Sequence, residues 1–122
     1  MTMGRSLIME GLKRILAEMD IELSASRLNV DTHWIGEDFD PLRKRIQQAS
    51  GKDFGSLTVI PRFVFEEGST TLIIYIRCSG LGRMGVEEFI EKAEPELMKM
   101  FTRIDGRKSR NNYVEWMFKF NL

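Results

Sequence analysis

The amino-acid sequence predicts an α+β fold, a two-layer sandwich in which about three helices cover a mainly antiparallel sheet. Three observations predict this fold. Apolar residues recur at helical spacing in three segments, β-rich runs separate these segments, and the two clearest β-rich runs are joined by a short loop that contains glycine. The expected order of elements is α-β-β-α-β-β-α-β, in a single domain that spans residues 1–122.

The first part of the chain predicts one helix and two short strands. Residues 6–19 place apolar side chains on one side of a helix, and Ser6 is its expected N-cap. Residues 21–25 and 28–34 alternate apolar with polar side chains, which is the period of a strand.

A second helix follows, marked by the residues at both of its ends. Asp40 is the expected cap, Pro41 occupies the first helical position and Gly51 follows the last turn. Its apolar side is formed by Phe39, Leu42, Ile46 and Ala49.

Residues 56–79 predict a β-hairpin whose loop is residues 66–69. Pro61 cannot donate a hydrogen bond to a neighbouring strand, so the first strand is expected at an edge of the sheet or with a bulge. The second strand is apolar on both faces because Ile73 and Tyr75 alternate with aliphatic residues. This pattern predicts a central strand with a helix or a partner subunit behind it.

The last third of the chain predicts a long helix and a final strand. Apolar residues keep helical register over residues 86–104, but Pro95 removes a backbone donor and predicts a kink or a split near Ala93. Residues 105–112 are polar and predict a turn, after which residues 113–122 alternate as a strand.

The composition is that of a soluble globular chain, with 43% hydrophobic and 30% charged residues. Lys plus Arg equals Asp plus Glu, 18 against 18, so no overall charge attracts nucleic acid or an anionic membrane. Cys78 is the one cysteine, which excludes an internal disulfide, and no run is apolar enough for a signal peptide or a membrane span. We therefore expect a cytoplasmic protein.

The motif G-x-G-x-x-G at Gly80, Gly82 and Gly85 is the pattern of a dinucleotide-binding loop. Such a loop needs a parallel β-α-β unit, whereas the strand before this one is already committed to a hairpin. We interpret the glycines as a turn that lets the chain leave a strand and begin a helix. The alternative is an anion or nucleotide bound at the helix N-terminus, with Arg77 and Arg83 as helpers.

A segment near the C-terminus combines positive charge with aromatic side chains, which is what single-stranded nucleic acid requires. The other interpretation is a hydrated turn whose charge balances the acidic residues 87–96 of the preceding helix. The nucleic-acid-binding candidates are Arg103, Arg107, Lys108, Arg110, Tyr113 and Trp116.

The sequence predicts no catalytic residues, no metal site and no cofactor. His33 is the one histidine and is distant in sequence from Cys78, so a nucleophile with its base is not indicated. The acidic residues Glu37, Asp38 and Asp40 precede a helix, where carboxylates favour the helix dipole without any metal.

The leading interpretation is a cytoplasmic, non-catalytic binding or assembly module that forms a homodimer or binds another protein. The apolar surplus predicts an interface that uses the last strand and the long helix. Its expected strand residues are Tyr113, Trp116, Phe118 and Phe120. Nucleic-acid binding through residues 103–116 and anion or nucleotide handling at residues 80–85 are the two alternatives.

Overall fold

The computed structural model describes residues 10–11, 13–18, 39–82, 85–101 and 103–122. The elements follow in the order α2 (Asp40–Ser50), β1 (Ser56–Glu66), β2 (Ser69–Ser79), α3 (Val86–Met100), β3 (Gly106–Ser109) and β4 (Tyr113–Asn121). Residues 10–11 and 13–18 are also helical. The predicted α+β class is confirmed, and the two strands predicted within residues 21–34 lie outside the described part of the chain.

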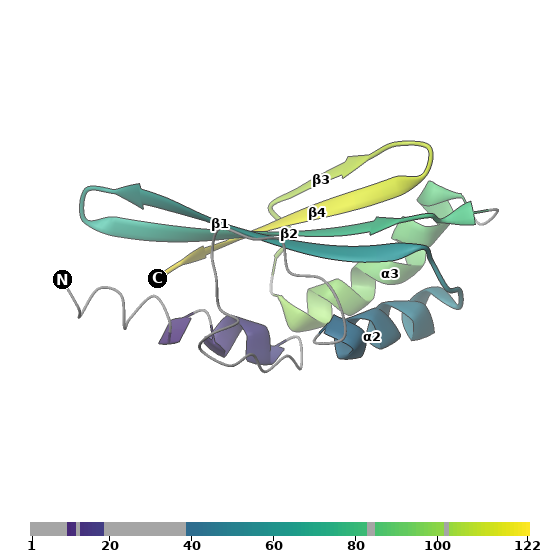
Figure 1. Cartoon of the computed structure of the whole chain (residues 1–122), viewed down its shortest axis with the longest axis horizontal. Helices are drawn as coiled ribbons and strands as arrows, with labels where there is room; N and C mark the ends of the chain where they lie inside the picture. Colours follow the sequence, from purple (N-terminus) through teal and green to yellow (C-terminus); the bar gives the residue numbers. More distant parts are fainter. Residues whose placement is uncertain (1–9, 12, 19–38, 83–84, 102) are drawn as a thin grey trace.

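The four strands form one antiparallel sheet in the order β1-β2-β4-β3. β2 therefore lies between β1 and β4, as its two apolar faces predict, and β1, the strand with Pro61, lies at one side of this sheet. Figure 1 shows α2 and α3 against the same face of the sheet, so the two layers are one of helices and one of strands.

The core lies between these layers and is formed by alternate residues of each strand. In β4, Val114, Trp116 and Phe118 are fully buried, which confirms the predicted alternation of that strand. Phe89 of α3 packs against Trp116 with ring centroids 6.3 Å apart. Because each large side chain buried in this way is worth about 1.5–3 kcal/mol, this layer contact is the main source of stability.

The second helix has the ends that the sequence predicts, except that its N-cap is shifted by one residue. Phe39 is the N-cap and makes no side-chain capping bond, while Asp40 stands in the first turn, where its charge favours the helix dipole. Gly51 ends the helix with a φ of 72°. The buried Phe39 ring explains the shift, because its position in the core fixes where the chain enters the helix.

α3 departs from its predicted course in two ways. It runs through Pro95 as one helix, so no split occurs there; Pro95 is exposed and the helix is held by its buried side. The helix ends at Met100 and not at Ile104, because Phe101 turns into extended backbone at φ −128° and ψ 134°. The Phe101 ring then contacts Phe118 and Phe120, at centroid distances of 4.5 Å and 5.4 Å.

The predicted polar turn at residues 105–112 is in part a strand. β3 pairs with β4 from Gly106 opposite Met117 to Ser109 opposite Val114. Three of the four β3 residues are exposed, so the segment has no apolar period that sequence reasoning could detect. Charged side chains on a short outer strand are typical of a sheet edge.

Candidate functional site

The glycine loop is accounted for by its backbone geometry. Gly80, Gly82 and Gly85 have φ values of 68°, 64° and 80°, a region that residues with a side chain rarely adopt. Gly80 also touches Gly55, whose N–H donates to the Gly80 carbonyl at 3.1 Å. A Cβ on Gly80 would lie 2.7 Å from the Gly55 Cα, so this contact requires glycine. These observations support a turn.

Of the two arginines predicted to assist an anion at that loop, Arg83 lies outside the described residues. Arg77 is engaged across the sheet. Its Nε donates to Glu115 Oε2 at 2.9 Å and its guanidinium lies 4.9 Å from the ring centroid of Tyr113. The charge of Arg77 is therefore balanced within the sheet.

The basic and aromatic residues of the predicted nucleic-acid site are not brought together on one surface. Trp116 is fully buried and its Nε1 donates to Glu94 Oε1 at 3.0 Å, so its ring is not accessible to a base. Arg107 pairs with the same Glu94 on the helix side of the sheet. Arg103 binds Asp105, with Nε 2.8 Å from Oδ1. Lys108 of β3 and Tyr113 of β4 share the face of the sheet opposite the helices, while Arg110 lies in the β3–β4 turn.

A further candidate surface is the face of the sheet opposite α2 and α3 (Figure 1). We call it the open face. Its side chains come from the strand positions that alternate with the core. They include Ile60, Arg62, Val64 and Glu66 of β1, Ile73, Tyr75 and Arg77 of β2, Lys108 of β3, and Tyr113, Glu115, Met117 and Lys119 of β4.

The centre of the open face is an apolar strip. Tyr75 pairs with Ile60 on one side and with Met117 on the other, and all three are only half-buried. Ile73 and Val64 extend the strip along β2 and β1, and both are also half-buried. The residue pattern of β2 already indicated a second apolar face, but the contributions of β1 and β4 require the register of the strands.

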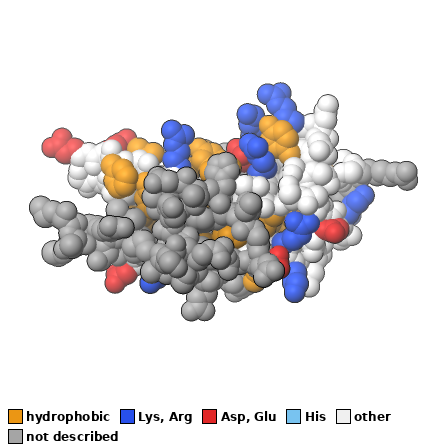
Figure 2. Space-filling view, in the orientation of Figure 1, with side chains coloured by type: hydrophobic (Ala, Val, Ile, Leu, Met, Phe, Trp, Pro, Cys, Tyr) orange, Lys and Arg blue, Asp and Glu red, His pale blue; other side chains and the backbone are white. Residues whose placement is uncertain are grey.

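Basic side chains flank this strip. In the next row of the sheet, Ile73 has Arg62 on one side and Lys119 on the other. Both are exposed, and neither forms an ion pair with any described residue. Figure 2 shows Lys and Arg side chains with hydrophobic side chains between them along the upper side of the molecule, away from the helices.

A shallow cavity of about 280 Å³ lies at the end of the open face that is nearest to the β1–β2 turn. Its floor includes Val64 and Ile73, and Lys119 and Arg103 stand at its wall. Glu66 is the acidic residue of its lining. The cavity thus combines apolar contact area with the charge of Lys119, since Arg103 is paired with Asp105.

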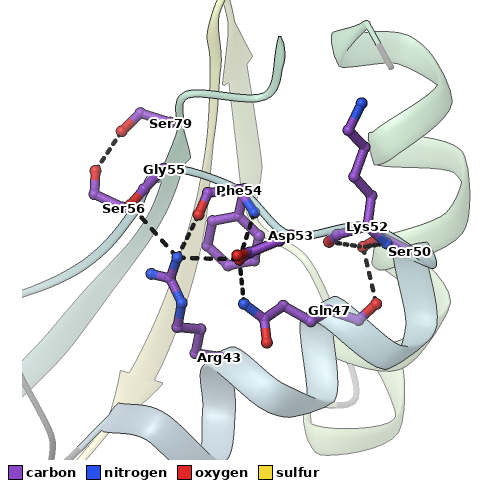
Figure 3. Close-up of polar contacts among 9 residues, drawn as sticks. All are labelled: Arg43, Gln47, Ser50, Lys52, Asp53, Phe54, Gly55, Ser56 and Ser79. Carbon is purple, nitrogen blue, oxygen red and sulfur yellow. Dashed lines mark hydrogen bonds and ion pairs between the residues drawn. The ribbon is translucent and has the colours of Figure 1, made fainter. Parts of the chain in front are cut away.

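A second polar cluster joins the end of α2 to the start of β1 (Figure 3). Arg43 donates to the carbonyls of Phe54 and Gly55, pairs with Asp53 at 3.3 Å, and stacks over the Phe54 ring at 4.7 Å. The N–H of Phe54 foremost, with Arg43 and Gln47, holds the pKa of Asp53 below its usual value. A cavity of about 300 Å³ borders this cluster, but Arg43, Gln47 and Asp53 are engaged in the α2–β1 connection, and Ser56 and Ser79 pair β1 with β2 (Figure 3).

The remaining reactive groups have structural surroundings. Cys78 is fully buried in β2, and this burial raises the pKa of its thiol, so the thiolate is disfavoured. His33, Glu37 and Asp38 lie outside the described residues. Among the residues that are described, no three His, Cys, Asp or Glu side chains are grouped in a way that could hold a metal ion. No helix of that part is long and apolar enough to cross a membrane.

Comparisons with protein-family models, with curated proteins and with solved structures gave no match for this chain.

Proposed function

We propose that this chain is a cytoplasmic, non-catalytic binding module and that the open face of its sheet is the surface that contacts the partner. One observation carries the proposal. The sheet has described helices on one face only, while its other face presents the half-exposed strip of Ile60, Ile73, Tyr75 and Met117. Half-exposed Tyr, Ile and Met surrounded by charge is the arrangement of a protein-binding patch.

The groups that could otherwise perform chemistry support a binding role. The Cys78 thiol is buried and protonated, and Arg43 and Asp53 are used to connect α2 with β1. A single cysteine that is kept inside the core also suits a reducing compartment, which supports the cytoplasmic assignment.

The homodimer predicted from the sequence stays a prediction, but its expected interface changes. The predicted interface used Tyr113, Trp116, Phe118 and Phe120 with the long helix, and of these Trp116 and Phe118 lie in the core of the single chain, whereas Tyr113 is half-buried. Phe120 packs on Phe101. A dimer burying about 1,000 Å² or more would need apolar surface outside the core, and the open face is one surface that offers it.

Site-specific photocrosslinking in native cells tests the proposal. The photoreactive amino acid p-benzoylphenylalanine is placed at Tyr75, in the centre of the open face, and in a second protein at Lys44, which is exposed on α2. We expect adducts from position 75 and none from position 44. Mass spectrometry of the adduct then distinguishes a protein partner, a second copy and a nucleic acid. Adducts from position 44 alone, or from neither position, contradict the proposal.

A further inference from the structure

The open face has a charge that its own sequence does not neutralise. Its four basic residues stand against Glu115 and, at the end of β1, Glu66, although the whole chain has a net charge of zero. Glu115 is already held by Arg77 at 2.8 Å. The excess therefore belongs to the three remaining basic residues, Arg62, Lys108 and Lys119.

Arg62 and Lys119 are placed so that they repel each other. They belong to the strands on either side of β2 and occupy the same cross-strand row, with Ile73 between them. Neighbouring strands lie about 5 Å apart, so the two side chains rise from positions about 10 Å apart on an apolar surface. A carboxylate bound above Ile73 would relieve this repulsion and would find two cations within reach.

From this arrangement we infer that the open face binds an acidic amphipathic segment of a partner protein, whose apolar side chains cover Ile73 and Tyr75 while its carboxylates meet Arg62 and Lys119. This inference rests on the proposed function and specifies the chemistry of the partner. The cavity beside Val64 and Ile73, which Lys119 also lines, is a second place for an apolar side chain followed by a carboxylate.

The same charges disfavour a second copy as the occupant. Two open faces in contact would bring Arg62 and Lys119 of one copy toward basic side chains of the other, and like charges brought together at an interface oppose association. Each face has only Glu66 and Glu115 to offset this, and Glu115 is already paired with Arg77.

Single-stranded nucleic acid is also a poor fit because it needs aromatic rings on which its bases can stack. Trp116 is buried, and the guanidinium of Arg77 already lies over the ring of Tyr113, 4.9 Å from its centroid. Tyr75 alone remains in the centre of the face, and its neighbours Ile60, Ile73 and Met117 are aliphatic. Aliphatic contacts together with positive charge suit an acidic peptide.

A charge-reversal selection tests the inference. Random peptides displayed on phage are selected against the full chain, against Arg62→Glu/Lys119→Glu, and against the matched control Lys13→Glu/Lys44→Glu on the helix layer, where both lysines are exposed. We expect the unaltered chain and the control to select peptides that combine Asp or Glu with aliphatic residues. The reversed variant should select peptides that carry Lys or Arg at those places.

The affinities of one selected acidic peptide for the three proteins then measure how much Arg62 and Lys119 contribute to binding. By fluorescence anisotropy, the reversed variant should bind it about tenfold more weakly, and the control should bind it with nearly unchanged affinity. Added salt should weaken binding to the unaltered chain. Circular dichroism checks that each variant is folded. If the reversed variant fails to fold, the neutral variant Arg62→Gln/Lys119→Gln replaces it, and this variant should bind the peptide with an intermediate affinity.

The inference is overturned if the peptides selected by the unaltered chain are not enriched in Asp or Glu. It is also overturned if Arg62→Glu/Lys119→Glu selects the same peptides as the unaltered chain. An oligothymidylate that binds more tightly than the peptides overturns it as well, as does a dimer seen by light scattering that Arg62→Glu/Lys119→Glu abolishes. Adducts from Tyr75 in the crosslinking experiment without acidic selection would reject only the acidic partner. If neither adducts from Tyr75 nor acidic peptides are found, the open face is rejected as the binding surface as well.

Discussion

Arg43 shows how one side chain can define the geometry of a connection. Its guanidinium covers the Phe54 ring and donates to two backbone carbonyls beyond α2. Lysine at the same place could offer one ammonium but not a planar group that stacks and donates at once. The sequence alone does not predict these contacts, since the partners of Arg43 lie on a loop whose position depends on the fold.

We expect Arg43→Ala to lower the free energy of unfolding by about 1–3 kcal/mol, because charge-assisted bonds to two backbone carbonyls and the ring contact are lost together. Urea unfolding measures the change. Lys44→Ala is the matched control: the residue is next in sequence and exposed, and its loss should change stability by less than about 0.5 kcal/mol. Equal effects at the two positions would contradict this role.

Asp53 should contribute a pH-dependent part of the stability. Its pKa is lowered from the ordinary value of 3.8, first by the N–H of Phe54, and the hydrogen bonds from Arg43 and Gln47 add to this effect against an opposing effect of desolvation. A depressed folded pKa means that the contribution is present above pH 3.8 and is lost as the pH falls below it. Melting temperatures of the unaltered chain and of Asp53→Asn should therefore differ at pH 6 and converge toward about pH 2. A constant difference across this range would contradict the prediction.

At the scale of elements, the sequence predicted best where local chemistry decides. The β1–β2 hairpin follows from period-two alternation around Gly68, and α2 from Pro41 and Gly51. The end of α3 and the presence of β3 were missed, because the rings of Phe118 and Phe120 and the pairing with β4 determine them. The sequence predicted the apolar part of the open face only for β2. Which residues of β1 and β4 lie beside it depends on the register of the strands.

The glycine turn gives a prediction with a built-in control. Gly80→Ala and Gly82→Ala both force a side chain into positive φ, which costs about 1–2 kcal/mol. At Gly82 the nearest atom to a new Cβ is Lys52 Nζ, 4.0 Å away, whereas at Gly80 it is the Gly55 backbone at 2.7 Å. Gly80→Ala should therefore be less stable than Gly82→Ala by about 1–3 kcal/mol in chemical denaturation. Equal losses of stability in the two variants would contradict the prediction, because the Gly55 backbone would then move aside for the new Cβ at little cost.

Across the whole molecule, stability should be graded from the centre of the sheet to β3. β2 is paired on both sides over most of its length and its alternate side chains are fully buried. β3 is short, pairs on one side in the described sheet and is largely exposed. Amide hydrogen exchange followed by NMR should find the slowest exchange at Ile74 and Ile76 and the fastest strand exchange at Arg107 and Lys108. Comparable rates in β2 and β3 would contradict this gradient.

The strand order also has a consequence for the rate of folding. The sheet consists of two local hairpins, β1–β2 and β3–β4, which meet along the single seam between β2 and β4. Residues 80–112 lie between the two strands of the seam. Closing this loop costs more conformational entropy than closing the short turn of either hairpin. Seam formation should then limit the rate. We expect stopped-flow kinetics to show that Ile76→Val, in the seam, slows folding, whereas Leu57→Ala, at the start of β1, mainly accelerates unfolding.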